Sequence, residues 1–310
     1  MTPTQLAVAV ISLCAACLLA GLKPVHALPQ VITTPGSKSL TVVGADGVAV
    51  PVGNYQRIVS GSTVVDHILM HVVEPERIVA VTWWGAEKLD GGFRFGAKPR
   101  LRSLESIEPI IVLRPDLVIT HNYDGDLKRI ARLRDAGVAV FDCGQMRGWS
   151  DLRDNLREVG QLLGQETRAA EVERDLRRRL HAIAGNIAPE SKRSGMYLSI
   201  YAGRLFGGTI GSSFHDMLTF AGVIDAAAAA GYKDWPQYDI EELLALNPEL
   251  IVTRTGMTAE LRAIAGLERV RALRDPKGIV ELSSALVEDP GFGLLPAAEA
   301  VHAAVYGDRP

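Results

Sequence analysis

Apolar residues in the stretch 239–254 first recur at helical spacing and then form an unbroken run. Ile240, Leu243 and Leu244 would share one face of a helix, and Pro248 would end that helix. Residues 250–252 are apolar and partly β-branched, which is typical of a buried parallel strand. The pattern therefore predicts a helix, a tight turn and a strand.

The same pattern occurs 133 residues earlier, at 106–121. Glu108 matches Glu241, Pro115 matches Pro248, and Ile, Leu and Thr residues also fall in identical register. A second match pairs 61–68 with 211–218, each a Gly-Ser turn that leads from a strand-like run into an apolar helix. Because both matches come in the same order, we infer two similar α/β lobes.

Strand-like runs alternate with helical patterns in both halves, and this alternation predicts parallel sheets. Residues 39–52 predict a β-hairpin at the edge of the first lobe. Residues 166–187 keep one apolar stripe through a charged sequence, which predicts a helix of roughly 30 Å. The expected fold is thus α/β, with parallel-sheet lobes at 28–165 and 188–310 joined by one long rigid helix and a ligand groove between the lobes.

Residues 1–27 have the pattern of a secretory signal peptide, with cleavage after Ala27. No Lys or Arg precedes the apolar core at 6–22, which departs from the signal-peptide pattern and leaves a retained membrane anchor as the alternative. The core is, however, shorter than the about 20 residues that a membrane span needs. Cys17 follows two alanines as in lipoproteins, but Cys14 stands where a Leu is expected, so we do not expect a lipid anchor. Cleavage would leave Cys143 alone, which excludes an internal disulfide.

The net charge of −3 describes an ordinary soluble surface, and no basic cluster is interleaved with aromatic residues, so nucleic acid is not an expected partner. His67 and His71 are four residues apart on one predicted helix, but no carboxylate joins them at metal-site spacing. We therefore do not expect a metal site at this pair.

Residues that follow predicted strands should line the groove, because ligands of open α/β sheets bind beyond the carboxyl ends of the strands. With one loop residue added, Trp235, the expected ligand-binding residues are Ser62, Trp84, His121, Tyr123, Arg147, Tyr201, Arg204, Trp235 and Arg254. Aromatic faces and arginines suit a large, flat, partly apolar ligand with amide or acidic groups.

Two of these assignments leave alternatives open. Trp83 and Trp84 should point opposite ways, and we assign Trp84 to the groove while either could instead pack in the core. His121 could coordinate cobalt or iron in the groove, or it could be a strand-end histidine that is hydrogen-bonded for packing.

The chain after residue 38 resembles the helical-backbone class of periplasmic binding proteins, which serve ATP-driven (ABC) importers of cobalamin, ferric siderophores and haem. The resemblance rests on the ordered set 57–60, 75–81, 113–119 and 300–306. The loop Asp234-Trp235-Pro236 is most similar to the vitamin B12-binding members. This resemblance implies a monomeric periplasmic protein, not an enzyme and without a cofactor, that binds a metal chelate, with a corrinoid favoured over a ferric siderophore or haem.

The same resemblance implies that Glu108 and Glu241, one in each lobe, dock onto the membrane subunits of the ABC transporter. Two carboxylates fixed on rigid helices would bind positive charge at two points of the transporter and so set the orientation of the docked protein. Alternatively, each carboxylate could be present only because a negative charge stabilises the start of a helix. A chelatase-like enzyme with His121 as base, or a secreted sensor domain, are the alternatives of another class. The signal peptide and the lack of a second His or Glu directed into the cleft argue against the enzyme.

Overall fold

The computed structural model describes residues 32–33, 40–84, 95–102, 104, 106–122, 127–185, 187–287 and 289–307. The predicted signal peptide at 1–27 lies outside these residues. Within the described part of the chain, no helix is long and apolar enough to cross a membrane.

The first lobe contains a parallel sheet of five strands in the order β6-β5-β4-β7-β8. These strands are β4 (Ile58–Ser60), β5 (Ile78–Thr82), β6 (Arg100–Leu101), β7 (Leu117–Thr120) and β8 (Val140–Asp142). The helices of this lobe are α2 (Thr63–Val72), α4 (Glu108–Val112), α5 (Lys128–Asp135) and α6 (Trp149–Leu162), with a 3₁₀ turn, η1, at Pro75–Arg77.

The second lobe contains a parallel sheet of four strands in the order β12-β9-β14-β15 and a small antiparallel sheet, β10-β11-β13. The strands are β9 (Ser194–Tyr197), β10 (Ser199–Tyr201), β11 (Arg204–Phe206), β12 (Ile224–Asp225), β13 (Gln237–Tyr238), β14 (Leu250–Arg254) and β15 (Ile279–Leu282). The helices are α8 (Ser213–Phe220), α9 (Ala226–Ala229), α10 (Ile240–Leu246), α11 (Met257–Ala263), α12 (Arg271–Arg274), α13 (Ser284–Val287) and α14 (Leu294–Tyr306), with 3₁₀ turns η3 (Pro189–Ser191) and η4 (Leu267–Arg269).

The two parallel sheets have equivalent strand orders, β5-β4-β7-β8 in the first lobe and β12-β9-β14-β15 in the second. Leu117 of β7 pairs with β4 in the same way that Leu250 of β14 pairs with β9. A residue with positive φ stands just before the proline that follows each repeated helix: Arg114 (46°), one residue after the C-cap of α4, and Asn247 (41°), the C-cap of α10. A residue before proline is disfavoured in the right-handed helical region, which explains the sharp stop. The predicted pair of similar parallel-sheet lobes is confirmed.

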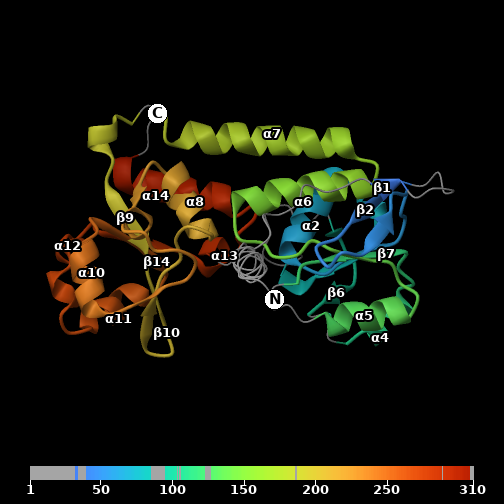
Figure 1. Cartoon of the computed structure of the whole chain (residues 1–310), viewed down its shortest axis with the longest axis horizontal. Coiled ribbons are helices and arrows are strands. Elements are labelled where there is room, and N and C mark those ends of the chain that lie inside the picture. Colours follow the sequence, from blue (N-terminus) through green and yellow to red (C-terminus); the bar gives the residue numbers. More distant parts are fainter. Residues whose placement is uncertain are drawn as a thin grey trace, which may run out of the picture.

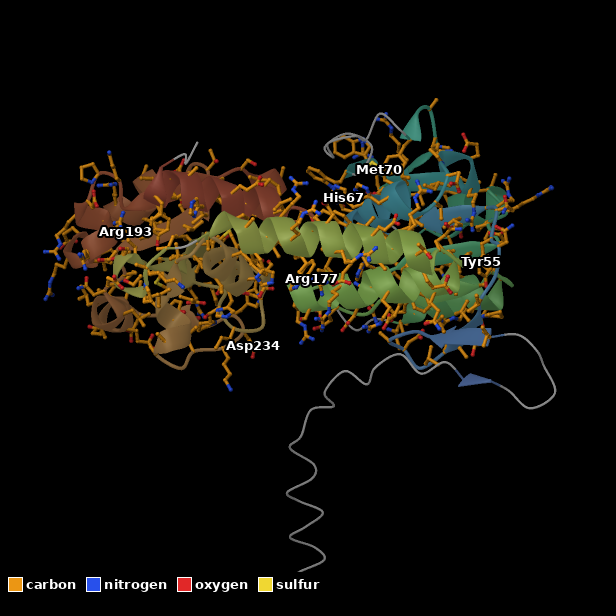
Figure 2. All side chains as sticks on the ribbon, turned by 90° about the horizontal axis from the view of Figure 1, so that it is seen from above. Tyr55, His67, Met70, Arg177, Arg193 and Asp234 are labelled. Atoms are coloured by element: carbon orange, nitrogen blue, oxygen red, sulfur yellow. The ribbon has the colours of Figure 1, made fainter. Side chains whose placement is uncertain are left out.

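Helix α7 (Glu166–Ile183) lies where the linking helix was predicted, and it ends four residues before the predicted boundary at 187. It runs over both lobes (Figures 1 and 2), packing on α6 and α2 of the first and on α8 and α14 of the second. Its buried residues, Ala169, Leu176 and Leu180, belong to one apolar cluster that draws members from both lobes. The lobes therefore share a hydrophobic core beneath α7, in addition to their covalent link. The rigidity of this link stays a prediction.

The predicted edge hairpin is present as β2 (Leu40–Val43) and β3 (Ala49–Pro51), with a short strand β1 (Ile32–Thr33) beside β2. Val42 and Val50 face each other across the hairpin and are buried in the shared core. Gly47 has a φ of 80° in the turn, a conformation that glycine adopts without strain.

Candidate ligand-binding site

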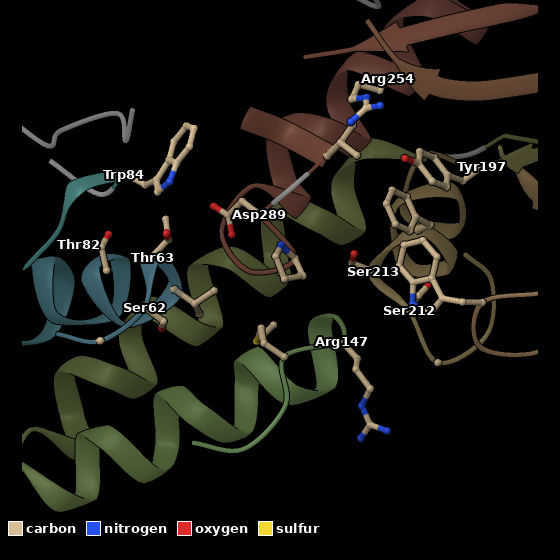
Figure 3. A pocket seen from close by; sticks show the side chains of 18 of the residues that line it. Ser62, Thr63, Thr82, Trp84, Arg147, Tyr197, Ser212, Ser213, Arg254 and Asp289 are labelled. Carbon is tan, nitrogen blue, oxygen red and sulfur yellow. The ribbon is translucent and has the colours of Figure 1, made fainter. Parts of the chain in front are cut away.

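A cavity of about 640 Å³ lies between the lobes, at the carboxyl ends of both parallel sheets (Figure 3). It is lined by Gly61, Ser62, Thr63, Val64, Thr82, Trp84, Arg102, Met146, Arg147, Tyr197, Gly211, Ser212, Ser213, Phe214, Trp235, Arg254, Val287, Asp289 and Pro290. Both lobes contribute their strand ends and the first turns of the helices α2 and α8. The volume is in the range of small-molecule sites.

Aromatic side chains form the wall of the second lobe. The rings of Tyr197 and Phe214 are stacked, with centroids 3.6 Å apart and planes 16° from parallel. Trp235 meets Phe214 edge-on at 5.2 Å and remains 54% exposed. Trp84 of the first lobe is 49% exposed and lines the opposite side of the cavity (Figure 3). Two accessible indoles thus face the cavity from the two lobes.

Three arginines add positive charge to the lining. The Arg147 Nε lies 3.2 Å from the Oδ2 of Asp151, and the Arg102 guanidinium lies 5.3 Å from the ring centroid of Trp83. Arg254 is paired through its backbone with β15, and its side chain has no hydrogen-bond or ionic partner among the described residues. The lining acid, Asp289, accepts hydrogen bonds from backbone amides of its own loop at 2.9 and 3.0 Å. The lining therefore suits a ligand that is flat and partly apolar and carries acceptor or acidic groups.

His121 follows β7 but is buried behind the cavity and is only 2% exposed. Its Nδ1 lies 2.8 Å from the Oγ of Ser62, and its Nε2 lies 2.8 Å from the Nδ2 of Asn155. Burial lowers the pKa of His121 to about 3, so the imidazole is neutral near pH 7. The geometry agrees with the packing alternative and not with a histidine that faces the groove, because both ring nitrogens already have neighbours in the protein.

A family model described as periplasmic binding protein matches residues 58–308. The chain belongs to the periplasmic binding protein family. Members of this family bind solutes and are not enzymes, as the sequence indicated.

Two relatives are similar in sequence to this binding protein. It is 26% identical over 211 residues to the uncharacterized ABC transporter substrate-binding lipoprotein YvrC of Bacillus subtilis (strain 168), a match that covers 66% of each chain. It is 25% identical over 165 residues to the vitamin B12-binding protein of Salmonella choleraesuis (strain SC-B67), which covers 51% of this chain and 58% of that one. The chain thus spans no more than about two thirds of these relatives.

The fold also matches a solved structure, the periplasmic heme-binding protein RhuT from Roseiflexus sp. RS-1 in apo form. The TM-score is 0.65 at 22% sequence identity, over 81% of this chain and 99% of that one. This likeness supports the two-lobed α/β architecture of the binding protein.

Five of the nine sequence-predicted residues line the cavity of the binding protein: Ser62, Trp84, Arg147, Trp235 and Arg254. Contact of any of them with a ligand stays a prediction. Trp83 is not in the lining; it is half-buried and meets Trp84 edge-on, with ring centroids 5.3 Å apart. Tyr123 lies outside the described residues.

Tyr201 and Arg204 do not line this cavity. They face each other across the turn of the β10-β11 hairpin, where Tyr201 is 76% exposed and Arg204 is hydrogen-bonded to Gln237. The sequence pattern at 196–200 predicts a single strand that leads to Tyr201, but β9 ends at Tyr197 and the separate hairpin begins at Ser199. The residue at the carboxyl end of β9 is therefore Tyr197, and not Tyr201.

The repeated turn carries more of the lining than strand ends alone suggested. Residues 61–64 and 211–214 align in the internal repeat, and all eight line the cavity. Ser212 could thus have been identified from its match to Ser62, the one residue of this turn that the sequence analysis assigned to the groove. Arg102 had no such signal, because the strand before it, β6, is only two residues long.

The two docking candidates lie away from the cavity, on helices at the outer ends of opposite lobes (Figure 1). Glu108 begins α4 and is exposed, 3.9 Å from Arg132. Glu241 is exposed in the first turn of α10, whose capping box is formed by Asp239 and Glu242. Both carboxylates are accessible, and their role in docking stays a prediction.

Proposed function

We propose that this protein captures a metal chelate outside the cytoplasm and delivers it to the membrane subunits of an ABC importer, with a corrinoid as the favoured ligand. The observation that carries the proposal is the pair of accessible indoles, Trp84 and Trp235, that face one cavity from opposite lobes. Flat apolar faces bind between such rings at a low cost in side-chain entropy. The similarity to a vitamin B12-binding protein supports the corrinoid.

The chemistry of the lining favours a corrinoid over haem. Haem iron needs an axial ligand from the protein, such as His, Cys, Met or Tyr, whereas a cobalt corrinoid carries axial ligands of its own. Among the described lining residues there is no histidine or cysteine, and His121 is already hydrogen-bonded on both sides. Tyr197 and Met146 are the described lining residues whose types could ligate iron, but each is only 5% exposed, and the ring of Tyr197 is stacked on Phe214.

Haem and ferric siderophores of the same ligand class are the second candidates. Arginines in the lining could bind the carboxylates of haem or the anionic groups of a siderophore. A haem-binding protein also has this fold. A tyrosinate–iron absorption band that disappears in Tyr197→Phe would favour haem.

Delivery is proposed to use Glu108 and Glu241, one exposed carboxylate on each lobe. Their equivalent places in the repeat suit a transporter with two similar membrane subunits. The signal peptide at 1–27 would direct the chain to the periplasm.

The test is calorimetric titration of the protein, purified after expression of the full chain, with cyanocobalamin, haem and ferric siderophores in turn. We expect cyanocobalamin to bind more tightly than about 10 µM, which corresponds to about −7 kcal/mol. If none of the three ligands binds that tightly, the proposed function is wrong.

A further inference from the structure

Two adjacent residues of α2, Asp66 and His67, lie behind the cavity and contact both of its walls. Asp66 is fully buried and His67 is nearly so, and neither lines the cavity. Burying an acid and a potential base is unfavourable unless partners compensate. The partners of this pair come from different lobes.

Asp66 holds the end of β5. Its two carboxylate oxygens each lie 3.2 Å from the backbone nitrogen of Thr82, and the Thr82 hydroxyl donates a second hydrogen bond to the carboxylate. Thr82 is the last residue of β5 and lines the cavity two residues before Trp84. The carboxylate therefore fixes the strand end from which the Trp84 indole projects.

His67 contacts the loop that enters α14 of the second lobe. Its Nδ1 lies 3.3 Å from the Oδ2 of Asp289, within ion-pair distance but without hydrogen-bond geometry, and its ring centroid lies 5.0 Å from that of Phe292. His71, one turn later, stacks on the same Phe292 at 5.2 Å. The rings of His67 and His71 thus both pack against one aromatic ring of the other lobe. Figure 2 places His67 on the side of α2 that faces this lobe.

Asp289 is both the neighbour of His67 and a residue of the cavity wall. Its carboxylate accepts hydrogen bonds from the backbone nitrogens of Gly291 and Gly293, and the residue lines the cavity (Figure 3). A Cβ built on Gly291 would lie 3.1 Å from a methyl group of Val64 in α2, so the loop packs closely against this helix. The loop is therefore held in one place relative to α2.

We propose that Asp66 and His67 are positioning residues that together set the separation of the two walls of the ligand groove. The proposal rests on the proposed function, because it assigns to this pair the width that a flat chelate must match. Adjacent residues of one hydrogen-bonded helix keep a fixed spacing, so a shift of either wall would have to break a contact to α2. Binding sites tolerate an error of only about 0.5 Å in such geometry.

The first test measures the Trp84 side chain without any ligand. In protein labelled with 5-fluorotryptophan, the ¹⁹F resonance of Trp84 is assigned with Trp84→Phe. We expect Asp66→Asn to shift or broaden this resonance while those of Trp149 and Trp235 stay unchanged. Asp225→Asn is the matched control, because Asp225 is also buried and also accepts from a threonine hydroxyl and backbone amides.

Thr82→Val is the second variant, in case Asp66→Asn does not fold, because it removes the hydroxyl donor from the other side of the same contact. An unchanged Trp84 resonance in every folded variant of this contact overturns the role of Asp66.

The second test measures the loop of the other lobe. We expect His67→Gln to speed amide hydrogen exchange at Gly291 and Gly293 by about tenfold, which corresponds to about 1.4 kcal/mol of local stability. His302→Gln is the matched control, since His302 is a buried helical histidine that bonds the carbonyl of Ala221, away from the cavity. Unchanged exchange in His67→Gln overturns the role of His67.

The third test connects the pair to binding. Asp66→Asn and His67→Gln should each weaken the affinity for cyanocobalamin about tenfold, and the double variant should lose less than the product, because both substitutions release one shared geometry. Altered ligand-free signals with unchanged affinity would overturn the proposal. If the wild-type protein does not bind cyanocobalamin, the corrinoid assignment fails, while the fluorine and exchange measurements still decide whether the pair positions the walls.

Discussion

Helix α6 of the first lobe is capped by a carboxylate from the second lobe. The backbone nitrogen of Trp149 donates to the Oδ2 of Asp216, in α8, at 2.7 Å. Gly148 occupies the N-cap position and has no side chain to supply a cap, and a Cβ there would collide with the same carboxylate. A contact that usually comes from the neighbouring residue thus joins the two lobes.

We expect Asp216→Ala to destabilise the protein by about 1–2 kcal/mol. Loss of an N-cap oxygen costs about 1 kcal/mol on average and up to about 2 kcal/mol. Attraction between a carboxylate and the helix dipole adds about 0.3–1 kcal/mol. Burial opposes both terms, because it raises the pKa of Asp216 and so disfavours the charged form, although the hydrogen bond from Trp149 acts in the other direction. The net loss should therefore stay below the sum of the favourable terms.

The assay is thermal unfolding followed by far-ultraviolet circular dichroism at neutral pH. A loss of about 1–2 kcal/mol should lower the Tm by about 2–3 °C for a chain of this size, because the entropy of unfolding grows with chain length. Asp216→Asn keeps an oxygen acceptor and should retain more than half of the stabilisation. Asp154→Ala is the control on the same helix, because its carboxylate pairs with Arg157 at the surface and should contribute little.

Two results would refute the cross-lobe cap. One is a Tm of Asp216→Ala within about 1 °C of the wild type, since an N-cap contributes more than that. The other is equal destabilisation by Asp216→Asn and Asp216→Ala, which would show that the acceptor oxygen is not what matters.

Four other experiments have definite expected outcomes. Burial raises the pKa of Asp66 from 3.8 to about 6, so the folded state holds the proton more tightly than the unfolded state. The stability that the protonated Asp66 contributes below about pH 4 is therefore lost as the pH rises through about 6. In urea unfolding, the wild type should lose roughly 3 kcal/mol relative to Asp66→Asn across this window, and a difference that stays constant with pH would contradict this. Glu108→Arg combined with Glu241→Arg should abolish transport in cells and leave the calorimetric affinity intact, whereas lost affinity would show that these residues act in binding. Trp235→Ala should weaken cyanocobalamin binding about tenfold or more with little change in Tm, because the side chain is half exposed; unchanged affinity would remove it from the site. Gly160→Val should cost about 1–3 kcal/mol in urea unfolding, because even a Cβ would lie 2.5 Å from that of Ala169 in α7, and a stable variant would show that α6 and α7 can separate.

The local pattern of apolar residues, glycines and prolines was sufficient to predict the repeated helices and strands and some of the residues that line the cavity. The repeated helix, turn and strand were predicted because spacing of apolar residues and a proline act within a few positions. Trp84 and Arg254 were expected near one another, and both line the cavity, because parallel strands place their carboxyl ends at one edge of the sheet. The sequence repeat also indicated the equivalence of the two sheets.

Tertiary contacts decided what the pattern could not. His121 turns away from the cavity toward Asn155, which is 34 residues later and on another element. Tyr201 lies outside the cavity lining because β9 ends at Tyr197, and nothing in the apolar pattern of this stretch indicates that end. The contact from His67 to Asp289 joins residues more than 200 positions apart, and it depends on how α7 and the shared core place one lobe against the other.

The buried cluster beneath α7 has a consequence for how the chain melts. Residues of α2 and α6 from the first lobe, α8 and α14 from the second, and α7 itself are in that one cluster. If one lobe unfolded, the residues of this cluster that belong to the other lobe would lose their apolar contacts and become exposed to water. We therefore expect a single cooperative unfolding transition in calorimetry in place of two separate ones. Two duplicated halves would then have become thermodynamically inseparable, and a truncated half-protein should not fold by itself.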